Sequence, residues 1–218
     1  MNKYLVIGNP IEHSLSPLLH NYWFKKHGIL DSIYEKQKVD KGDLKRIIEQ
    51  VKNGEIKGVN VTVPFKREIF DYLDSSSHEV KLTKSVNTIL KEGDKVVGYN
   101  TDQGGFEISL QKKNWKSEGK KILIFGAGGV TPSILLTFIK TNGDNKIYLC
   151  NRTRDKAEKL KEFWDKTINL FGNNKNTLEI VDWGKKIEMC DLVINTTSVG
   201  LSKDENISYD FSDYDNNK

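Results

Sequence analysis

Cysteine is nearly absent from this chain, with two residues among 218, and long hydrophobic runs are absent altogether. Two cysteines cannot staple a small secreted scaffold, and Cys150 and Cys190 each lie in or beside an apolar stretch. We therefore expect buried free thiols and a cytoplasmic protein. No segment approaches the roughly 18 consecutive apolar residues that span a bilayer. Residues 1–8 also lack the apolar region and cleavage site of a signal peptide, and we expect no membrane partner.

A dominant charge of one sign is missing as well. The chain has 34 basic and 30 acidic side chains, which gives a net charge of +4, and the two kinds are dispersed among one another. A nucleic-acid-binding protein would concentrate its basic residues on one face. We therefore expect no nucleic-acid partner.

Metal-ligand clusters are also lacking. His13, His20 and His27 recur every seven residues, but Ser16 and Pro17 interrupt any continuous helix that would align all three. No group of carboxylates or cysteines completes a ligand set. We expect no metal site.

What the sequence does contain is an alternation of strand-like and helix-like segments, which is typical of α/β architecture. Expected strands are 4–8, 33–39, 58–63, 86–90, 95–99, 121–125, 146–150, 178–181 and 191–194. Expected helices are 16–27, 43–52, 66–73, 103–112, 132–140 and 154–164. The rhythm changes across the polar stretch 112–120. We predict two domains, 1–113 and 114–218, the second a doubly wound, Rossmann-like unit.

A glycine-rich turn follows the apolar strand expected at 121–125. Its residues are Gly126, Ala127, Gly128, Gly129 and Val130. Such a turn lets backbone amides approach a pyrophosphate, and the following helix N-terminus adds donors and a favourable dipole. The string lacks the full G-x-G-x-x-G spacing, and glycines also serve ordinary turns, so it indicates a nucleotide site only together with its surroundings.

The residues after the next strand bear on which nucleotide binds. An NAD site carries an acidic residue there for the ribose hydroxyls, whereas this chain has Asn151, Arg152 and Thr153. A guanidinium at this point can bind a 2′-phosphate through charge-assisted hydrogen bonds, which favours NADP. The alternative is that Asn151 caps the next helix and Arg152 is a solvated charge.

A third polar segment follows the strand expected at 191–194. It contains Thr196 and Ser198, small hydroxyl residues at the carboxyl end of a parallel strand, where ligands of open α/β sheets bind. An ordinary loop has much the same composition. We include both residues as supporting members of the cofactor site.

The first half holds polar strings next to strands or at helix starts. They read S-L-S-P at 14–17, N-V-T-V-P-F-K at 60–66, V-N-T at 86–88 and Y-N-T-D at 99–102. Hydroxyls and amides suit the oxygens of a small polyhydroxylated carboxylate. An ammonium–carboxylate pair suits proton transfer.

Together with G-N-P-I-E-H at 8–13, G-A-G-G at 126–129 and N-R-T at 151–153, these strings resemble the shikimate dehydrogenase family over essentially the entire chain. The resemblance implies an NADP-dependent oxidoreductase acting on a CH-OH group. Its reaction would be the reversible reduction of 3-dehydroshikimate to shikimate, in aromatic amino-acid biosynthesis. It also implies a substrate-binding first domain, an NADP-binding second domain, and an active site between them.

By the same resemblance, individual residues acquire roles. Lys66 and Asp102 are the catalytic pair, with Lys66 exchanging the proton and Asp102 positioning the ammonium. The substrate-binding residues are Ser14, Ser16, Thr62, Asn87 and Thr101. The turn at 126–130 holds the pyrophosphate of NADP, and residues 151–153 hold the adenosine phosphate.

Each of these residues has a plainer interpretation. Ser16 and Asp102 can act as helix N-caps, Thr62 as an ordinary strand residue and Lys66 as a surface lysine. The resemblance favours the catalytic interpretation for Lys66 and Asp102, and does so less firmly for Thr101.

Members of the family normally continue past the point where this sequence stops. The resemblance implies a further strand, part of the nicotinamide pocket and a substrate-binding glutamine, so we expect an incomplete second domain. The last residues, 209–218, form a polar stretch in which we expect no closing element. Two alternatives stay open: a quinate/shikimate dehydrogenase, and a non-catalytic module that binds nucleotide or shikimate-like ligands. We expect a monomer or homodimer.

Overall fold

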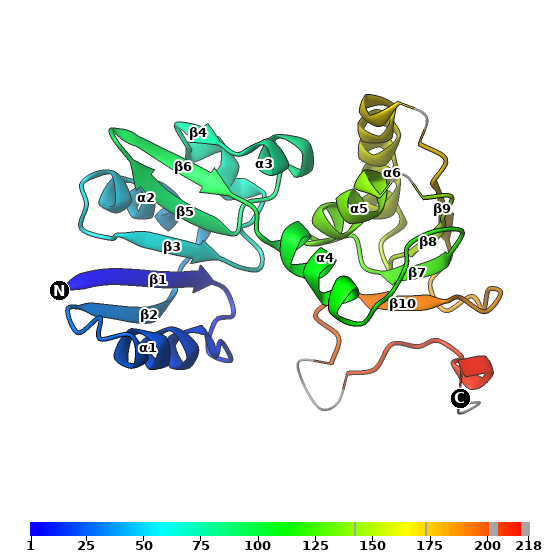
Figure 1. The fold of residues 1–218 in the computed structure, drawn as a ribbon, viewed down its shortest axis with the longest axis horizontal. Helices are drawn as coiled ribbons and strands as arrows, with labels where there is room; N and C mark the ends of the chain where they lie inside the picture. Colours follow the sequence, from blue (N-terminus) through cyan, green and yellow to red (C-terminus); the bar gives the residue numbers. More distant parts are fainter. Residues whose placement is uncertain (142, 173, 201–204, 215–218) are drawn as a thin grey trace. The chain divides into compact units, whose positions relative to one another are not determined.

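The computed structural model describes residues 1–141, 143–172, 174–200 and 205–214. The chain divides into two compact units, Met1–Asp102 and Gln103–Lys218 (Figure 1). This division falls at the start of a helix, eleven residues before the predicted domain boundary; the assignment of substrate and cofactor to residues 1–113 and 114–218 stays a prediction. No helix in the described ranges is long and apolar enough to cross a membrane.

The first unit is built on a six-stranded mixed sheet with strand order β2-β1-β3-β5-β6-β4. Its strands are β1 (Asn2–Gly8), β2 (Ser32–Lys38), β3 (Gly58–Val61), β4 (Ser75–Ser76), β5 (Thr88–Glu92) and β6 (Lys95–Tyr99). Strand β1 pairs in parallel with β2 and β3, whereas β5 is antiparallel to both β3 and β6. Because β5 reverses direction between them, the carboxyl ends of β3 and β6 and the start of β5 meet at one edge of the sheet.

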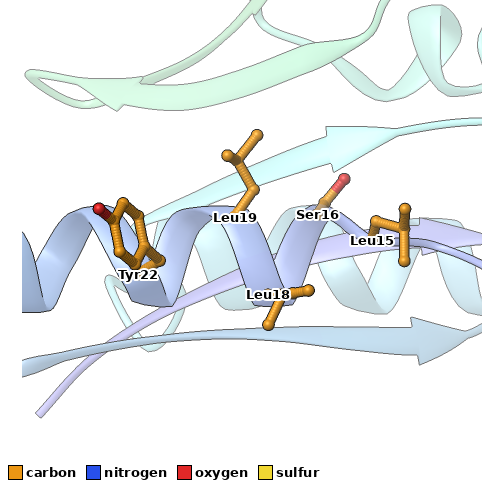
Figure 2. A pocket seen from close by; sticks show the side chains of 5 residues that line it. All are labelled: Leu15, Ser16, Leu18, Leu19 and Tyr22. Carbon is orange, nitrogen blue, oxygen red and sulfur yellow. The ribbon is translucent and has the colours of Figure 1, made fainter.

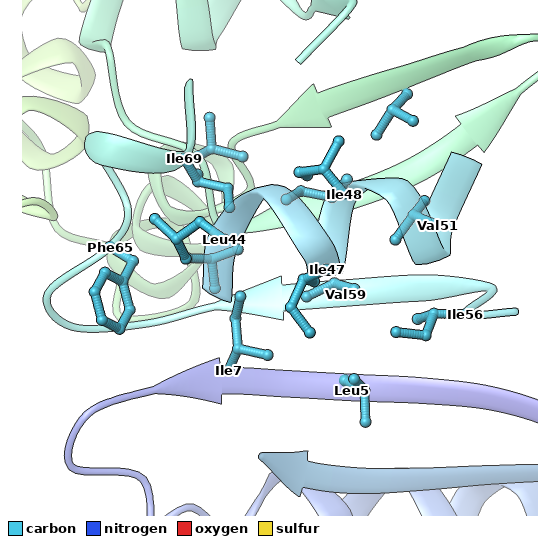
Figure 3. Packing of buried hydrophobic residues seen from close by; sticks show 14 of the residues in the cluster. Leu5, Ile7, Leu44, Ile47, Ile48, Val51, Ile56, Val59, Phe65 and Ile69 are labelled. Carbon is cyan, nitrogen blue, oxygen red and sulfur yellow. The ribbon is translucent and has the colours of Figure 1, made fainter. Parts of the chain in front are cut away.

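The core of this unit lies between the sheet and helix α2 (Leu44–Lys52). Leu44, Ile47, Ile48 and Val51 recur at helical spacing and are all buried, because this spacing puts them on one face of the helix. Figure 3 shows this face against the strand residues, among them Val59.

Helix α1 (Ser16–Lys26) joins the unit through a polar contact with β2. The Asn21 side chain donates to the Tyr34 carbonyl (2.8 Å) and accepts from the Tyr34 N–H (2.9 Å), as a neighbouring strand would. The opposite side of the helix is apolar and exposed. Leu15, Leu18, Leu19 and Tyr22 line a shallow hollow there with Ser16 (Figure 2).

The first unit differs from expectation in several details. Ser16 does not cap α1: Leu15 occupies the N-cap position without a side-chain cap, and the Ser14 Oγ accepts from the Ser16 N–H at 3.4 Å. The helix expected at 66–73 is a 3₁₀ helix, η2 (Glu68–Tyr72). A short helix, α3 (His78–Thr83), was not predicted, because six residues are too few for a clear period; η1 (Lys41–Asp43) precedes α2.

The second unit contains a four-stranded parallel sheet of order β10-β7-β8-β9. Its elements are α4 (Asp102–Lys112), β7 (Lys121–Phe125), α5 (Thr131–Lys140), β8 (Lys146–Cys150), α6 (Arg154–Ile168), η3 (Asn169–Phe171), β9 (Thr177–Val181), β10 (Leu192–Asn195) and η4 (Ser212–Tyr214). Strands β7 and β10 are neighbours in the sheet although strands β8 and β9 and their helices lie between them in the sequence. This is the topological switch point, where open α/β sheets bind ligands at the carboxyl ends of their strands. The predicted α/β, Rossmann-like class is confirmed.

The segment 205–214 packs against this sheet, contrary to the expectation of a polar tail. Tyr209 and Phe211 contact the Phe125 ring, at centroid distances of 5.3 and 6.2 Å. The Tyr214 hydroxyl accepts from the Cys190 N–H at 2.9 Å. The aromatic residues alternate with Asp and Ser, so the polar composition concealed a half-buried segment. Both cysteines are free and buried, as predicted.

Candidate functional site

Lys66 and Asp102 form an ion pair at the edge of the first sheet, although 36 residues separate them in sequence. The distance from Nζ to Oδ2 is 2.7 Å, and the side chains are 13% and 20% exposed. Such low exposure limits screening by water, so the attraction exceeds that of a surface pair. The plainer interpretation of Lys66 as a surface lysine is therefore wrong.

The fold brings the pair together through the geometry of the sheet. Lys66 follows β3, and its carbonyl accepts from the Val86 N–H (2.7 Å) just before β5. Asp102 follows β6, and its N–H donates to the Asn100 side chain (3.0 Å). Asp102 opens α4, but its carboxylate contacts side chains of the first unit, so the N-cap interpretation is wrong too.

Asn87 connects this pair to Thr101. Its Nδ2 donates to the Asp102 Oδ1 (2.8 Å) and the Thr101 Oγ1 (2.9 Å), and its Oδ1 accepts from the Thr101 N–H (3.1 Å). The two carboxylate oxygens of Asp102 thus have different partners, Lys66 and Asn87. The structure brings these four predicted residues into one hydrogen-bonded group.

The other predicted substrate residues lie outside this hydrogen-bonded group. The backbone of Thr62 continues β3 by donating to the Ile7 carbonyl (2.9 Å). A Cβ at Gly8 would lie 2.5 Å from the Thr62 Cγ2, so glycine is what permits this approach. Within the described ranges, the hydroxyls of Ser16 and Thr62 make no hydrogen bond, which leaves both able to bind a ligand.

Sequence reasoning gave no role to Asn60 and Thr88, which both form hydrogen bonds with Asn87. The Asn60 Nδ2 donates to the Asn87 carbonyl and to the Thr88 Oγ1, both at 3.1 Å. The Thr88 hydroxyl donates to the Asn87 Oδ1 at 3.0 Å. The available signal was a polar residue within the otherwise apolar strand β3 and another at the start of β5, before Ile89 and Leu90.

The glycine-rich turn of the second unit lies at the carboxyl end of β7, beside β10. Gly126 has φ +108°, and a Cβ there would lie 2.6 Å from the Thr196 Oγ1, so only glycine fits. The Ala127 N–H donates to the Asn151 Oδ1 at 3.0 Å. The interpretation of Asn151 as a helix cap is wrong, because Thr153 occupies the N-cap position of α6.

Two threonine hydroxyls form hydrogen bonds with the backbone at the start of this turn. The Thr196 Oγ1 donates to the Phe125 carbonyl (2.7 Å) and lies 2.9 Å from the Thr131 Oγ1. The Thr131 hydroxyl also lies 3.2 Å from the Gly126 carbonyl. Thr196 is thus engaged with the backbone of the turn, and Thr131, which sequence reasoning missed, shares this task. Ser198 is exposed.

The arginines after β8 differ in their partners. Arg154 is paired with Glu158 (3.0 Å) and Asp182 (2.6 Å). Arg152 is exposed, and its guanidinium forms no ion pair within the part of the chain that the structure describes. A free guanidinium and a glycine cradle without a neighbouring ribose-binding carboxylate fit a nucleotide that bears a 2′-phosphate.

Comparison with known proteins gives consistent matches over both units. Residues 6–89 match the family described as the shikimate dehydrogenase substrate binding domain. Shikimate dehydrogenase (NADP(+)) of Pelagibacter ubique is 43% identical over 208 residues, covering 95% of this chain and 73% of that protein.

Solved structures agree with these sequence matches. Shikimate dehydrogenase from Aquifex aeolicus has a TM-score of 0.83 and 35% identity, covering 97% of this chain and 74% of that one. Shikimate 5-dehydrogenase from Thermus thermophilus, in complex with NADP(H) and shikimate, has a TM-score of 0.75 and 29% identity, covering 92% and 70%. Identity of this degree, extending through both units, shows that the chain belongs to the shikimate dehydrogenase family.

Proposed function

We propose that this chain is a shikimate dehydrogenase, which catalyses the reversible reduction of 3-dehydroshikimate to shikimate with NADPH. The observation that carries the proposal is the largely buried ion pair between Lys66 and Asp102. Asn87 donates a hydrogen bond to Asp102, and the chain belongs to the shikimate dehydrogenase family. An ammonium fixed by a carboxylate is suited to exchange a proton with an alcohol or ketone oxygen.

The proton chemistry rests on the first unit. In the direction of reduction, the Lys66 ammonium donates its proton to the carbonyl oxygen, and in oxidation the amine accepts it from the hydroxyl. Asp102 orients Lys66 because its Oδ2 accepts a hydrogen bond from the Lys66 Nζ at 2.7 Å. The other carboxylate oxygen, Oδ1, accepts from Asn87. NADP, when bound, accepts or supplies the hydride.

Substrate recognition is assigned to the polar side chains around this pair. Ser14 and Ser16 bind the ring carboxylate, and the ring hydroxyls are bound by Thr62, Asn87 and Thr101. The unengaged hydroxyls of Ser16 and Thr62 support this assignment, because each can donate to a ligand without breaking an internal hydrogen bond.

Cofactor binding is assigned to the second unit. The turn at 126–130 binds the pyrophosphate through its backbone, and Asn151, Arg152 and Thr153 bind the adenosine phosphate. Thr196 supports the turn and Ser198 lies on the same edge of the sheet. Arg152 has no competing carboxylate within the described ranges, which supports a preference for NADP over NAD.

The setting is proposed from composition. Two reduced thiols support a cytoplasmic protein, and dispersed charges support the absence of a nucleic-acid partner. We infer a monomer or homodimer without a membrane partner.

Turnover of the whole chain tests the proposal. The chain is mixed with shikimate and either NADP+ or NAD+, and reduced nicotinamide is followed by its absorbance; quinate replaces shikimate in a parallel series. We expect turnover of shikimate with NADP+ and much slower turnover with NAD+. Binding of NADP+ without any turnover would instead identify a ligand-binding module, and equal rates with quinate would identify a quinate/shikimate dehydrogenase.

A further inference from the structure

A chain of hydrogen bonds runs through the first sheet to the Lys66–Asp102 pair. We propose that Tyr34, Asn60 and Thr88 are positioning residues, which fix the orientation of the Asn87 amide and thereby the carboxylate of Asp102. The effect of these residues on catalysis rests on the proposed function. The hydrogen bonds that connect them do not depend on that function.

The first link begins on β2. The Tyr34 side chain is 4% exposed and reaches across β1, and its hydroxyl donates to the Asn60 Oδ1 on β3 at 2.6 Å. The ring is held in place by His20, which stacks on it at a centroid distance of 4.2 Å. Because the Asn60 oxygen faces the phenol, the Asn60 Nδ2 must face the opposite way, toward β5.

The second link crosses from β3 to β5, where Asn60 and Thr88 are paired in register. The Thr88 Oγ1 accepts from the Asn60 Nδ2 at 3.1 Å. Since that lone pair is occupied, the single hydroxyl hydrogen of Thr88 is available to the Asn87 Oδ1 at 3.0 Å.

The third link sets the catalytic carboxylate. With its oxygen facing Thr88 and the Thr101 N–H, Asn87 presents its Nδ2 to the Asp102 Oδ1 at 2.8 Å. Donation therefore runs in one direction, from Tyr34 to Asp102. Reversing the Asn60 amide would oppose its oxygen to the Asn87 carbonyl, and reversing the Asn87 amide would oppose its oxygen to Asp102. In this arrangement the hydroxyls of Tyr34 and Thr88 each donate to an amide oxygen and hold that amide in place.

The consequence concerns the second oxygen of Asp102, which contacts Lys66. A carboxylate anchored at one oxygen cannot rotate freely, so the ammonium is held at a constant position. Displacement of reacting groups by about 1 Å can cost two orders of magnitude in rate, even when the altered residue is remote. The relay thus keeps the Lys66 Nζ in place for proton transfer.

Two matched pairs of variants test the relay. Thr88→Val removes the hydroxyl at nearly constant volume, whereas Thr88→Ser keeps it. Tyr34→Phe removes the first donor. Tyr4→Phe makes the same change on the adjacent strand, at a phenol without a hydrogen bond in the described ranges. Thermal unfolding of every variant is recorded, and rates are measured well below the lowest midpoint.

We expect Thr88→Val and Tyr34→Phe to lower kcat for shikimate about tenfold, with the KM for NADP+ unchanged. Thr88→Ser and Tyr4→Phe should stay within about twofold of the unmodified chain. A loss in Thr88→Ser as large as that in Thr88→Val would overturn the relay, since packing rather than the hydroxyl would then be responsible. So would equal rates for the two phenylalanine variants.

A second measurement does not require turnover. Lysines are acylated with acetic anhydride, and the modification of Lys66 is compared by mass spectrometry with that of the exposed Lys45 and Lys91. Loosening of Asp102 should raise the relative labelling of Lys66 about threefold in Thr88→Val and Tyr34→Phe only. Unchanged labelling in both variants would overturn the relay. If the chain without substitutions showed no turnover, the proposed function would be refuted. The comparison of Lys66 labelling between the variants would still decide whether the relay exists.

Discussion

At the scale of single residues, the two oxygens of Asp102 have separate tasks. One contacts the Lys66 ammonium at 2.7 Å and the other accepts from Asn87 at 2.8 Å. A carboxylate shared in this way can hold the lysine without rotating when the substrate arrives. The role of Lys66 as the proton-exchanging group leads to a direct prediction.

Replacing Lys66 by alanine should lower kcat about 100-fold or more, because general acid–base catalysis contributes roughly that much. Steady-state turnover of shikimate with NADP+ measures the effect. Lys45→Ala, at an exposed position of α2, serves as the control and should leave kcat unchanged. Near-normal turnover in Lys66→Ala would rule out the assignment.

Arg152 and Arg154 make a matched pair for cofactor recognition. Arg154 is already engaged by Glu158 and Asp182, whereas Arg152 has no such partner in the described ranges. Arg152→Ala should therefore raise the KM for NADP+ about tenfold and leave that for NAD+ nearly constant, since a charge-assisted bond to phosphate contributes roughly 1.5–3 kcal/mol. A larger effect from Arg154→Ala, measured in the same assay, would contradict this ordering.

At the scale of elements, the turn after β7 depends on a neighbouring strand. Gly126 is confined by Thr196, which follows β10, and the turn is further held by Asn151, which follows β8. Residues at the carboxyl ends of β7, β8 and β10 thus fix the conformation of the glycine-rich turn. We expect this conformation to be most sensitive to substitution at Gly126.

Gly126→Ala should lower the free energy of unfolding of the second unit by about 3 kcal/mol, because it combines a positive φ with a Cβ collision at 2.6 Å. Urea unfolding followed by tryptophan fluorescence reports this. As a control, Gly105→Ala in α4 has open space around the new methyl group and should raise stability by about 0.5–1 kcal/mol. Equal stabilities for the two variants would show that the turn tolerates a side chain.

Most elements were predictable because their periods are local. The apolar runs 121–125 and 146–150 became β7 and β8 with the expected bounds, and the helical spacing from Leu44 to Val51 became α2. Short elements such as α3 were not predicted, because six residues make less than two helical turns and show no clear apolar periodicity.

At the scale of the whole molecule, each unit has its own core and each contains a tyrosine with a raised pKa. Burial raises the pKa of Tyr34 to about 12, and chiefly burial raises that of Tyr214 to about 12. A group whose folded pKa exceeds its unfolded value near 10 stabilises the fold in its protonated form. That contribution is complete below pH 10 and is lost as the pH rises from 10 toward 12.

Stability should therefore fall above pH 10, and Tyr34 should account for roughly 1.4 kcal/mol of the loss by pH 11, since a shift of one pKa unit corresponds to about 1.4 kcal/mol. Urea unfolding at pH 8, 10 and 11 measures the dependence. In Tyr34→Phe the slope above pH 10 should be shallower than in Tyr4→Phe, whatever the difference in absolute stability. Identical slopes would show that Tyr34 does not contribute.

The candidate site was predictable only in part. The resemblance of the strings at 60–66 and 99–102 to the shikimate dehydrogenase family implied the pairing of Lys66 with Asp102; position after a strand alone favoured a surface lysine and a helix cap. The catalytic, substrate-binding and cofactor-binding roles of the site residues stay predictions. The supporting residues Asn60, within β3, and Thr131, at the start of α5, could not be assigned, since a single polar side chain has no local pattern that reveals its partner.

The sequence by itself determined the order of the elements, the α/β class, the glycine turn and the family, because these depend on local periodicity and short motifs. Only the tertiary structure decided which hydroxyls are free and which are engaged: Thr62 makes no side-chain hydrogen bond in the described ranges, while Thr196 supports the turn. It also decided that the aromatic residues of 205–214 cover a sheet rather than forming a polar tail. The reason is physical: such outcomes depend on contacts between segments far apart in sequence, and these exist only once the strands are paired and the cores are packed.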